Sequence, residues 1–144
     1  MKIVVLNNLT ESQLSDLQLL LGELVSDVII GPDKIKGAVS EPGTHVFAAI
    51  DEEGHVRGCA VMCINSLLTG KQATVENVIV SSSCRGRHVG WSLMEFLIEY
   101  ARTHYGDIVL NLTSNPKRVA ANNLYRSLGF QQRETNVYKL EVRR

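Results

Sequence analysis

The residues best suited to chemistry follow an apolar segment, residues 73–80, in a turn that contains arginine and glycine. The turn is Arg85-Gly-Arg-His-Val-Gly90, and an amphipathic pattern begins within it. A strand, a turn and a helix N-terminus in this order can hold an anion, because the first helical amides lack partners and the helix dipole favours negative charge. Glycine permits close backbone approach, and two arginines can fork onto phosphate oxygens. Solvated loop charges are the alternative interpretation.

The spacing of these residues narrows the kind of anion. No Gly-Lys-Ser/Thr follows the turn, so it is not a Walker nucleotide loop. The glycine spacing also fails the dinucleotide-binding fingerprint. A diphosphate without an obvious metal site fits the turn better.

A carboxylate interrupts the apolar segment at Glu76. Strict alternation along a strand places it on the same face as Val78. A charge in that position is costly unless it is paired or faces a wet cleft. Glu76 therefore has two interpretations: one member of an ion pair at a sheet edge, or a general base in a partly buried acceptor cleft.

Two further side chains could move protons. Tyr125 lies on the apolar stripe of a predicted helix, so it is either a core residue with a satisfied hydroxyl or a donor of a proton to a leaving thiolate. His88 most simply completes the basic turn, and a catalytic role is its alternative.

The elements that must position these residues are predicted from apolar periodicity. Thr10 and Gln13 have the spacing of a capping box, and the leucines behind them predict a helix to about Val25. Gly54 suits a hairpin loop, and Gly106 suits the end of a long helix. Further helices are expected at 34–40, 89–104 and 115–128, and strands at 3–6, 45–50, 56–64, 73–80, 108–112 and 137–142.

Composition bounds the class of protein. The 144 residues, 44% hydrophobic and 21% charged, suit one globular domain, residues 1–144. Fifteen basic and fifteen acidic side chains argue against a dedicated nucleic-acid or membrane-surface protein. Three scattered cysteines predict neither a disulfide framework nor a zinc site, and Cys59 and Cys63 are expected to be small buried hydrophobes. The N-terminus lacks the pattern of a signal peptide, so a cytoplasmic location is expected.

The segment from Arg85 to Gly90, after Val78-Ile-Val80, resembles the acetyl-CoA signature of the GNAT superfamily of N-acetyltransferases, Arg/Gln-x-x-Gly-x-Gly/Ala. The run 115–130, with Leu124-Tyr125 and Leu128-Gly-Phe130, resembles the second signature of that family. The sequence departs from the family at His88, which stands at the first glycine position. If the residue there is helical, histidine meets no requirement for positive φ and the anion cradle can survive. Arg118 stands where many relatives carry asparagine.

The resemblance implies a mixed α/β fold: about seven strands, splayed between the fourth and fifth, flanked by about four helices. It implies direct attack of an amine on the thioester of acetyl-CoA, without a metal. Glu76 would be the base and Tyr125 the proton donor. The residues expected to hold acetyl-CoA are Val78, Ile79, Val80, Arg85, Gly86, Arg87, His88, Val89, Gly90, Trp91, Asn115, Arg118 and Asn122.

The acceptor stays open at this point. A small-molecule amine is expected, such as an aminosugar or an amino-acid-like metabolite, in a pocket shaped by the first helix, residues 26–43 and the 65–72 loop. One alternative is a module that binds acyl-CoA and senses it without turnover. Another is acetylation of a protein N-terminus or lysine. Homodimer formation is also left open.

Overall fold

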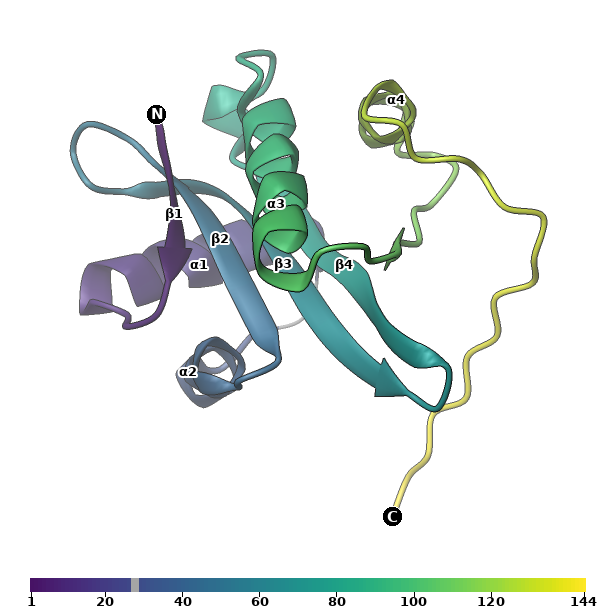
Figure 1. Ribbon diagram of the computed structural model, residues 1–144. Helices are drawn as coiled ribbons and strands as arrows, with labels where there is room; N and C mark the ends of the chain where they lie inside the picture. Colours follow the sequence, from purple (N-terminus) through teal and green to yellow (C-terminus); the bar gives the residue numbers. More distant parts are fainter. Residues whose placement is uncertain (27–28) are drawn as a thin grey trace. The chain divides into compact units, whose positions relative to one another are not determined.

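The computed structural model describes residues 1–26 and 29–144. Its contacts divide the chain into two compact units, residues 1–113 and 114–144. The first unit contains β1 (Lys2–Leu6), α1 (Glu11–Leu24), α2 (Pro32–Ser40), β2 (Thr44–Ile50), β3 (Val56–Leu67), β4 (Gly70–Val80), the 3₁₀ turn η1 (Ser82–Cys84), α3 (Val89–Tyr105) and β5 (Leu110–Asn111) (Figure 1). The second contains α4 (Val119–Ser127).

The first unit is built on one mixed sheet in the order β1-β2-β3-β4-β5. The first four strands pair antiparallel with their neighbours, and β5 joins β4 in parallel. The β4–β5 pairing is limited to Ala73 with Leu110 and Thr74 with Asn111, whereas β4 continues to Val80. The two strands therefore diverge beyond Thr74, which is the splay expected between the fourth and fifth strands.

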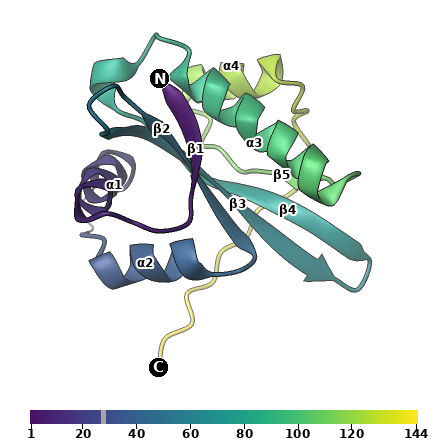
Figure 2. The same cartoon turned by 60° about the vertical axis from the view of Figure 1, so that its left-hand side comes forward.

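Helices cover both faces of this sheet. Figure 2 shows α1 and α2 on one face and α3 on the opposite face. Alternation along the strands supplies each face with its apolar side chains. Phe47 and Met62 pack on the α3 face, where rings of α3 contact Phe47, while Ala48 and Cys59 belong to the core beneath α1 and α2. Among the described helices, none is long and apolar enough to cross a membrane.

Several local predictions are confirmed. The Thr10 hydroxyl accepts the Gln13 amide at 3.1 Å, and the Gln13 side chain accepts the Thr10 amide at 3.1 Å, so the capping box is present. Gly54 has φ 87° in the β2–β3 loop, and Gly106 has φ 68° at the end of α3. Both positions lie in the left-handed region that glycine adopts at low cost.

The C-terminal part departs from expectation. Five strands are found in the described residues instead of about seven, and the strand predicted at 137–142 is absent. Its apolar side chains are 72% to 88% exposed, because alternation favours a strand but does not supply the partner that a ladder requires. The strand predicted at 108–112 shortens to β5. The last helix begins at Val119 instead of near Pro116, because Asn115 forms a turn first, its side chain accepting the Lys117 amide at 2.9 Å.

Candidate active site

The basic turn leads into α3 through two left-handed residues. Gly86 has φ 81°, and His88, which precedes the helix, has φ 60° and ψ 21°. The side chain of His88, the N-cap residue, forms no capping hydrogen bond at the start of α3. The amides at the start of this 17-residue helix therefore point outward, where an anion can accept hydrogen bonds from them.

The backbone of His88 does not have the helical conformation under which histidine would meet no requirement for positive φ. It is left-handed, a conformation that glycine adopts at low cost. Histidine is among the non-glycine residues most often found in that region, so the cost is modest. Histidine at this position therefore adopts the left-handed conformation without a large penalty.

The two arginines of the turn are exposed, and one of them is hydrogen-bonded to the end of the sheet. Arg85 Nε donates to the carbonyl of Val80 at 3.3 Å, which holds the guanidinium beside the end of β4. A carboxylate also approaches the turn, because Glu23 Oε1 of α1 accepts the Ser82 amide at 3.2 Å. Behind the turn, Cys84 is buried and anchors it to the core. The indole N–H of Trp91 donates to Glu95 one helical turn later.

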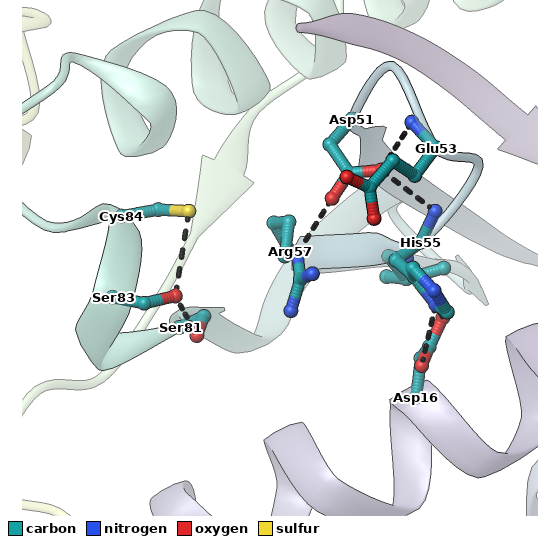
Figure 3. A network of polar contacts seen from close by, with 9 residues as sticks. Asp16, Asp51, Glu53, His55, Arg57, Ser81, Ser83 and Cys84 are labelled. Carbon is teal, nitrogen blue, oxygen red and sulfur yellow. Dashed lines mark hydrogen bonds and ion pairs between the residues drawn. The ribbon is translucent and has the colours of Figure 1, made fainter.

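A polar network supports the sheet end from which this turn departs (Figure 3). In the β2–β3 loop, Asp51 Oδ1 accepts the amides of Glu53 and His55, each at 2.9 Å. Its other oxygen accepts from Arg57 Nε at 2.7 Å. The hydrogen bond from Arg57 is the main cause that lowers the pKa of Asp51, and the His55 amide adds to it. The loop therefore holds a fixed conformation around an ionised carboxylate.

The same network reaches α1 and the segment that joins β4 to the basic turn. Asp16 of α1 accepts the Val56 amide at 3.0 Å and lies 3.2 Å from His55 Nδ1. On the other side, the Ser81 amide donates to the carbonyl of Arg57 at 2.7 Å. Figure 3 shows the serine and cysteine side chains of this segment beside Arg57. Helix α1, the hairpin loop and the segment before the basic turn are thus held to one strand, β3.

A β-bulge interrupts β4 beside Glu76. Cys59 pairs with Ile79 and Val61 pairs with Glu76, so one residue of β3 faces two residues of β4, Asn77 and Val78. Asn77 has φ 49°, which asparagine tolerates better than most residues. A bulge of this kind adds one residue to one strand and changes the direction of its side chains.

The bulge decides which way Glu76 points. Residues directly opposite each other in a ladder share a face. Glu76 therefore shares the face of Val61, and Ile79 shares the face of Cys59, which is the face covered by α1 and α2. Strict alternation had placed Glu76 with Val78, and this prediction was wrong because the extra residue intervenes.

The exposure and the partners of Glu76 test its two interpretations, the acceptor cleft and the ion pair. Glu76 is exposed, so the partial burial expected for an acceptor cleft is not found. Within residues 1–26 and 29–144, Glu76 has no ion-pair partner. The ion pair at a sheet edge is thereby excluded for these residues. An exposed carboxylate that points to the α1/α2 face remains able to exchange protons with solvent.

A pocket of about 230 Å³ opens on that same face. The bulge contributes Asn77, whose carbonyl accepts a hydrogen bond from Cys59 Sγ at 3.4 Å. Burial raises the pKa of Cys59 to about 12, so its thiol stays protonated. Residues of the 26–43 segment line this pocket, although 27–28 lie outside the described residues. No described residue of the 65–72 loop lines it. The lining is Leu17, Leu21, Val25, Ile30, Lys34, Ile35, Ala38, Val39, Val46, Cys59, Val61 and Asn77.

Residues 114–144 bring together the side chains predicted for the second signature. Tyr125 is 6% exposed and its ring meets Phe130 edge-on at 6.0 Å. Burial raises the pKa of the Tyr125 phenol, while the charge and hydrogen bond of Arg118 oppose the rise. Asn122 Nδ2 donates to the carbonyl of Asn115 at 3.0 Å. Tyr125 thus stays protonated at neutral pH, as a proton donor must be.

In the part of the chain that the structure describes, no three histidine, cysteine, aspartate or glutamate side chains lie together so that they could hold a metal ion.

The family model of the acetyltransferase (GNAT) family matches residues 16–130. The chain belongs to this family. Comparison with curated protein sequences finds no match. Both signatures noted in the sequence lie within the matched range, so the GNAT match and the residues single out the same stretches.

Solved structures of GNAT-like architecture match nearly the whole chain. A Trypanosoma brucei acetyltransferase is 26% identical with a TM-score of 0.78, covering 98% of this chain and 99% of its own. Glucosamine-6-phosphate N-acetyltransferase from Arabidopsis thaliana is 18% identical with a TM-score of 0.75, covering 97% and 99%. An aminoglycoside acetyltransferase from an uncultured soil sample is 16% identical with a TM-score of 0.80, covering 99% and 96%. Because the last two are only 18% and 16% identical to this chain, they support the fold alone.

Two residues of this GNAT chain were missed at the sequence level. Asn77 forms the bulge, and its signal was a second polar residue next to Glu76 inside an apolar strand. Lys34 lines the pocket, but a lysine in a short exposed helix gives no sign of that role.

Proposed function

We propose that this GNAT chain is an acetyl-CoA-dependent N-acetyltransferase that acetylates the primary amine of a small molecule, with residues 1–144 acting as one domain. The family match supports a single domain across the boundary between residues 113 and 114, because it runs from residue 16 to residue 130. The observation that carries the proposal is the uncapped start of α3, behind the left-handed residues Gly86 and His88 and beside the end of β4.

The residues of this turn fit a diphosphate. Outward amides at the start of α3 would donate hydrogen bonds to its oxygens, and Arg85 and Arg87 would add positive charge. The divergence of β4 from β5 leaves a place where an extended arm could lie along residues 78–80. We assign Asn115, Arg118 and Asn122 to the same ligand by resemblance to the second signature.

Bound acetyl-CoA would supply an acetyl group activated as a thioester. In the proposed reaction the Glu76 carboxylate takes a proton from the acceptor ammonium, directly or through a water. The freed lone pair forms the N–C bond, the C–S bond breaks, and its electron pair stays on sulfur. Tyr125 gives that sulfur a proton and regains one from the nitrogen by way of solvent. One proton is released per acetyl group transferred.

Direct attack is favoured over an acyl-enzyme intermediate by the state of Cys59. This thiol lines the pocket, but its pKa of about 12 leaves almost no thiolate at neutral pH, and the thiolate is the nucleophilic form. The amine of the acceptor is then the nucleophile that the site has to activate.

Cofactor binding is tested by thermal unfolding with acetyl-CoA. At a ligand concentration about 100-fold above Kd, binding adds about 2.7 kcal/mol to the free energy of unfolding. Gly90→Val is expected to remove this shift, since a side chain there would block backbone approach. The control is Gly22→Val on α1, where an added Cβ has nothing within 4 Å and the shift should persist. A folded protein without a shift in millimolar acetyl-CoA would contradict the proposal.

The base is tested with Glu76→Gln. We expect normal binding of acetyl-CoA and a loss of about 10² to 10⁴ in acetyl transfer at pH 7, recovering at high pH where the amine is already neutral. Glu52→Gln, at an exposed site in the β2–β3 loop, is the matched control and should transfer at the wild-type rate. A chain that binds acetyl-CoA but acetylates no amine at any pH would instead be a sensing module.

A further inference from the structure

The lining of the pocket on the α1/α2 face indicates a class of acceptor. Apart from Lys34 and Asn77, every lining side chain is a hydrocarbon or the protonated thiol of Cys59. A sugar bound there would leave several hydroxyls without partners, which is costly. The volume of about 230 Å³ exceeds that of an apolar cavity of about 150 Å³ that holds benzene. A branched aliphatic or aromatic group therefore fits both its size and its chemistry.

One cation stands at the edge of this apolar surface. Lys34 lies in the first turn of α2 and is exposed, and within the described residues it has no ion-pair partner. Ala38 lies one turn later on the same helix face as Lys34, and both residues line the pocket. An unpaired ammonium beside a hydrocarbon lining complements a ligand whose apolar body ends in an anionic group.

The sheet wall of the pocket consists of Val46, Cys59, Val61 and Asn77, and the last of these belongs to the bulge of β4. Glu76 does not line the pocket itself, but it lies directly opposite Val61 in the ladder and shares the face onto which the pocket opens. The pocket thus has a carboxylate beside its sheet wall, an ammonium on its helix wall and an otherwise largely hydrocarbon lining. An amine and a carboxylate on one apolar molecule would each find the opposite charge.

We infer that the acceptor is an apolar amine that carries one carboxylate, with hydrophobic amino acids as the simplest members of the class. Its hydrocarbon body fills the pocket, its carboxylate pairs with Lys34, and its amine lies toward Glu76. This assignment rests on the proposed acetyl transfer and names the substrate class of that same site.

The test compares acceptors that differ in one property. Leucine is set against 3-methylbutylamine, which lacks the carboxylate, against alanine, which lacks most of the apolar body, and against glucosamine 6-phosphate, a polar amine. Each buried methylene favours binding by about fourfold, so kcat/KM is expected to rise steeply from alanine to leucine. Glucosamine 6-phosphate is expected to be the poorest acceptor. Equal or better transfer to the sugar would overturn the assignment.

The role of Lys34 is tested with a pair of variants on one helix. Lys34→Ala should lower kcat/KM for leucine about fivefold, as expected for an exposed ion pair, and leave 3-methylbutylamine unchanged. Lys36→Ala removes an exposed lysine that does not line the pocket and should change neither. Two results would refute the pairing of the ligand carboxylate with Lys34. One is an equal loss of kcat/KM for leucine and 3-methylbutylamine in Lys34→Ala, and the other is an equal loss in Lys34→Ala and Lys36→Ala.

A binding measurement separates this inference from the proposed reaction. Leucine binding is followed by NMR in the presence of coenzyme A, in the wild type and in Ala38→Phe, which fills the pocket from an exposed helix position. Binding that Ala38→Phe abolishes supports the pocket even if no acetyl group is transferred, and in that case only the reaction is wrong. Acetyl transfer to other amines without leucine binding would refute the pocket and leave the reaction in place.

Discussion

The two faces of the central sheet are packed to different degrees. On the α3 face, Phe47, Met62, Leu93 and Leu97 are fully buried, and the ring of Phe47 meets those of Phe96 and Tyr100 edge-on at 5.8 and 5.2 Å. On the α1/α2 face the same strands border a pocket of about 230 Å³. Both faces are apolar, so composition does not distinguish them.

This difference in packing predicts different roles for the two faces. A closed face loses stability with every methylene removed, because the surroundings collapse only in part. A face that already holds a pocket has less packing to lose, and its side chains are available to a ligand. The α3 face is therefore expected to govern stability, and the α1/α2 face the choice of acceptor.

The largest expected effect is a contrast between two leucines. Leu97→Ala on the α3 face should lower the free energy of unfolding by about 2–5 kcal/mol, because this side chain is 0% exposed. Leu21→Ala, half-buried in the pocket wall, should cost clearly less, since the site is already open. Urea unfolding of both variants measures the contrast. Equal losses would remove the distinction between the faces.

An intermediate effect is expected from adding atoms to the closed face. A Cβ at Gly58 would lie 3.0 Å from Leu93 Cδ1 and 3.3 Å from the carbonyl oxygen of Ile79. Gly58→Ala should therefore destabilise the protein by about 1–3 kcal/mol, because the backbone oxygen cannot move aside easily. Gly22→Ala in α1, where a Cβ meets nothing within 4 Å, should be neutral or stabilising. A harmless Gly58→Ala would show that α3 can shift.

The smallest effect is a pH dependence at the margin of the α3 face. His45 Nε2 lies 2.6 Å from the Tyr105 hydroxyl, and burial, followed by the charge of His104, lowers the pKa of His45 below 6.5. The unfolded chain then binds the proton more readily than the folded chain does. The contribution of neutral His45 to stability is therefore present above pH 6.5 and is lost as the pH falls through the folded pKa. Denaturation midpoints at pH 7.5 and 5.5 should differ more in the wild type than in His45→Gln. An equal difference between the two midpoints in the wild type and in His45→Gln would mean that other groups cause the pH dependence of stability.

Short-range patterns predicted much of this molecule. The capping box of Thr10 and Gln13, the glycine that ends α3 and the uncapped helix start after the basic turn depend on a few neighbouring residues, and all three are present. The longer-range features were not predictable in this way. The segment 137–142 has the alternation of a strand, but pairing depends on a partner that alternation does not identify. The pocket depends on how α1 and α2 sit on the sheet, and the periodicity of each helix does not determine that.

The bulge of β4 also makes the site depend on chain length as well as on residue type. Glu76 and Ile79 point to the same side although they are separated by an odd number of positions, and the additional residue between them is what allows it. A deletion of Asn77 would leave Glu76 and the other side chains proposed for catalysis and acetyl-CoA binding in the protein. It would nevertheless force the strand to turn Glu76 towards the closed core beneath α3 or to shift the whole hairpin by one position. Sequence changes in this strand are therefore tolerated as substitutions far more readily than as insertions or deletions.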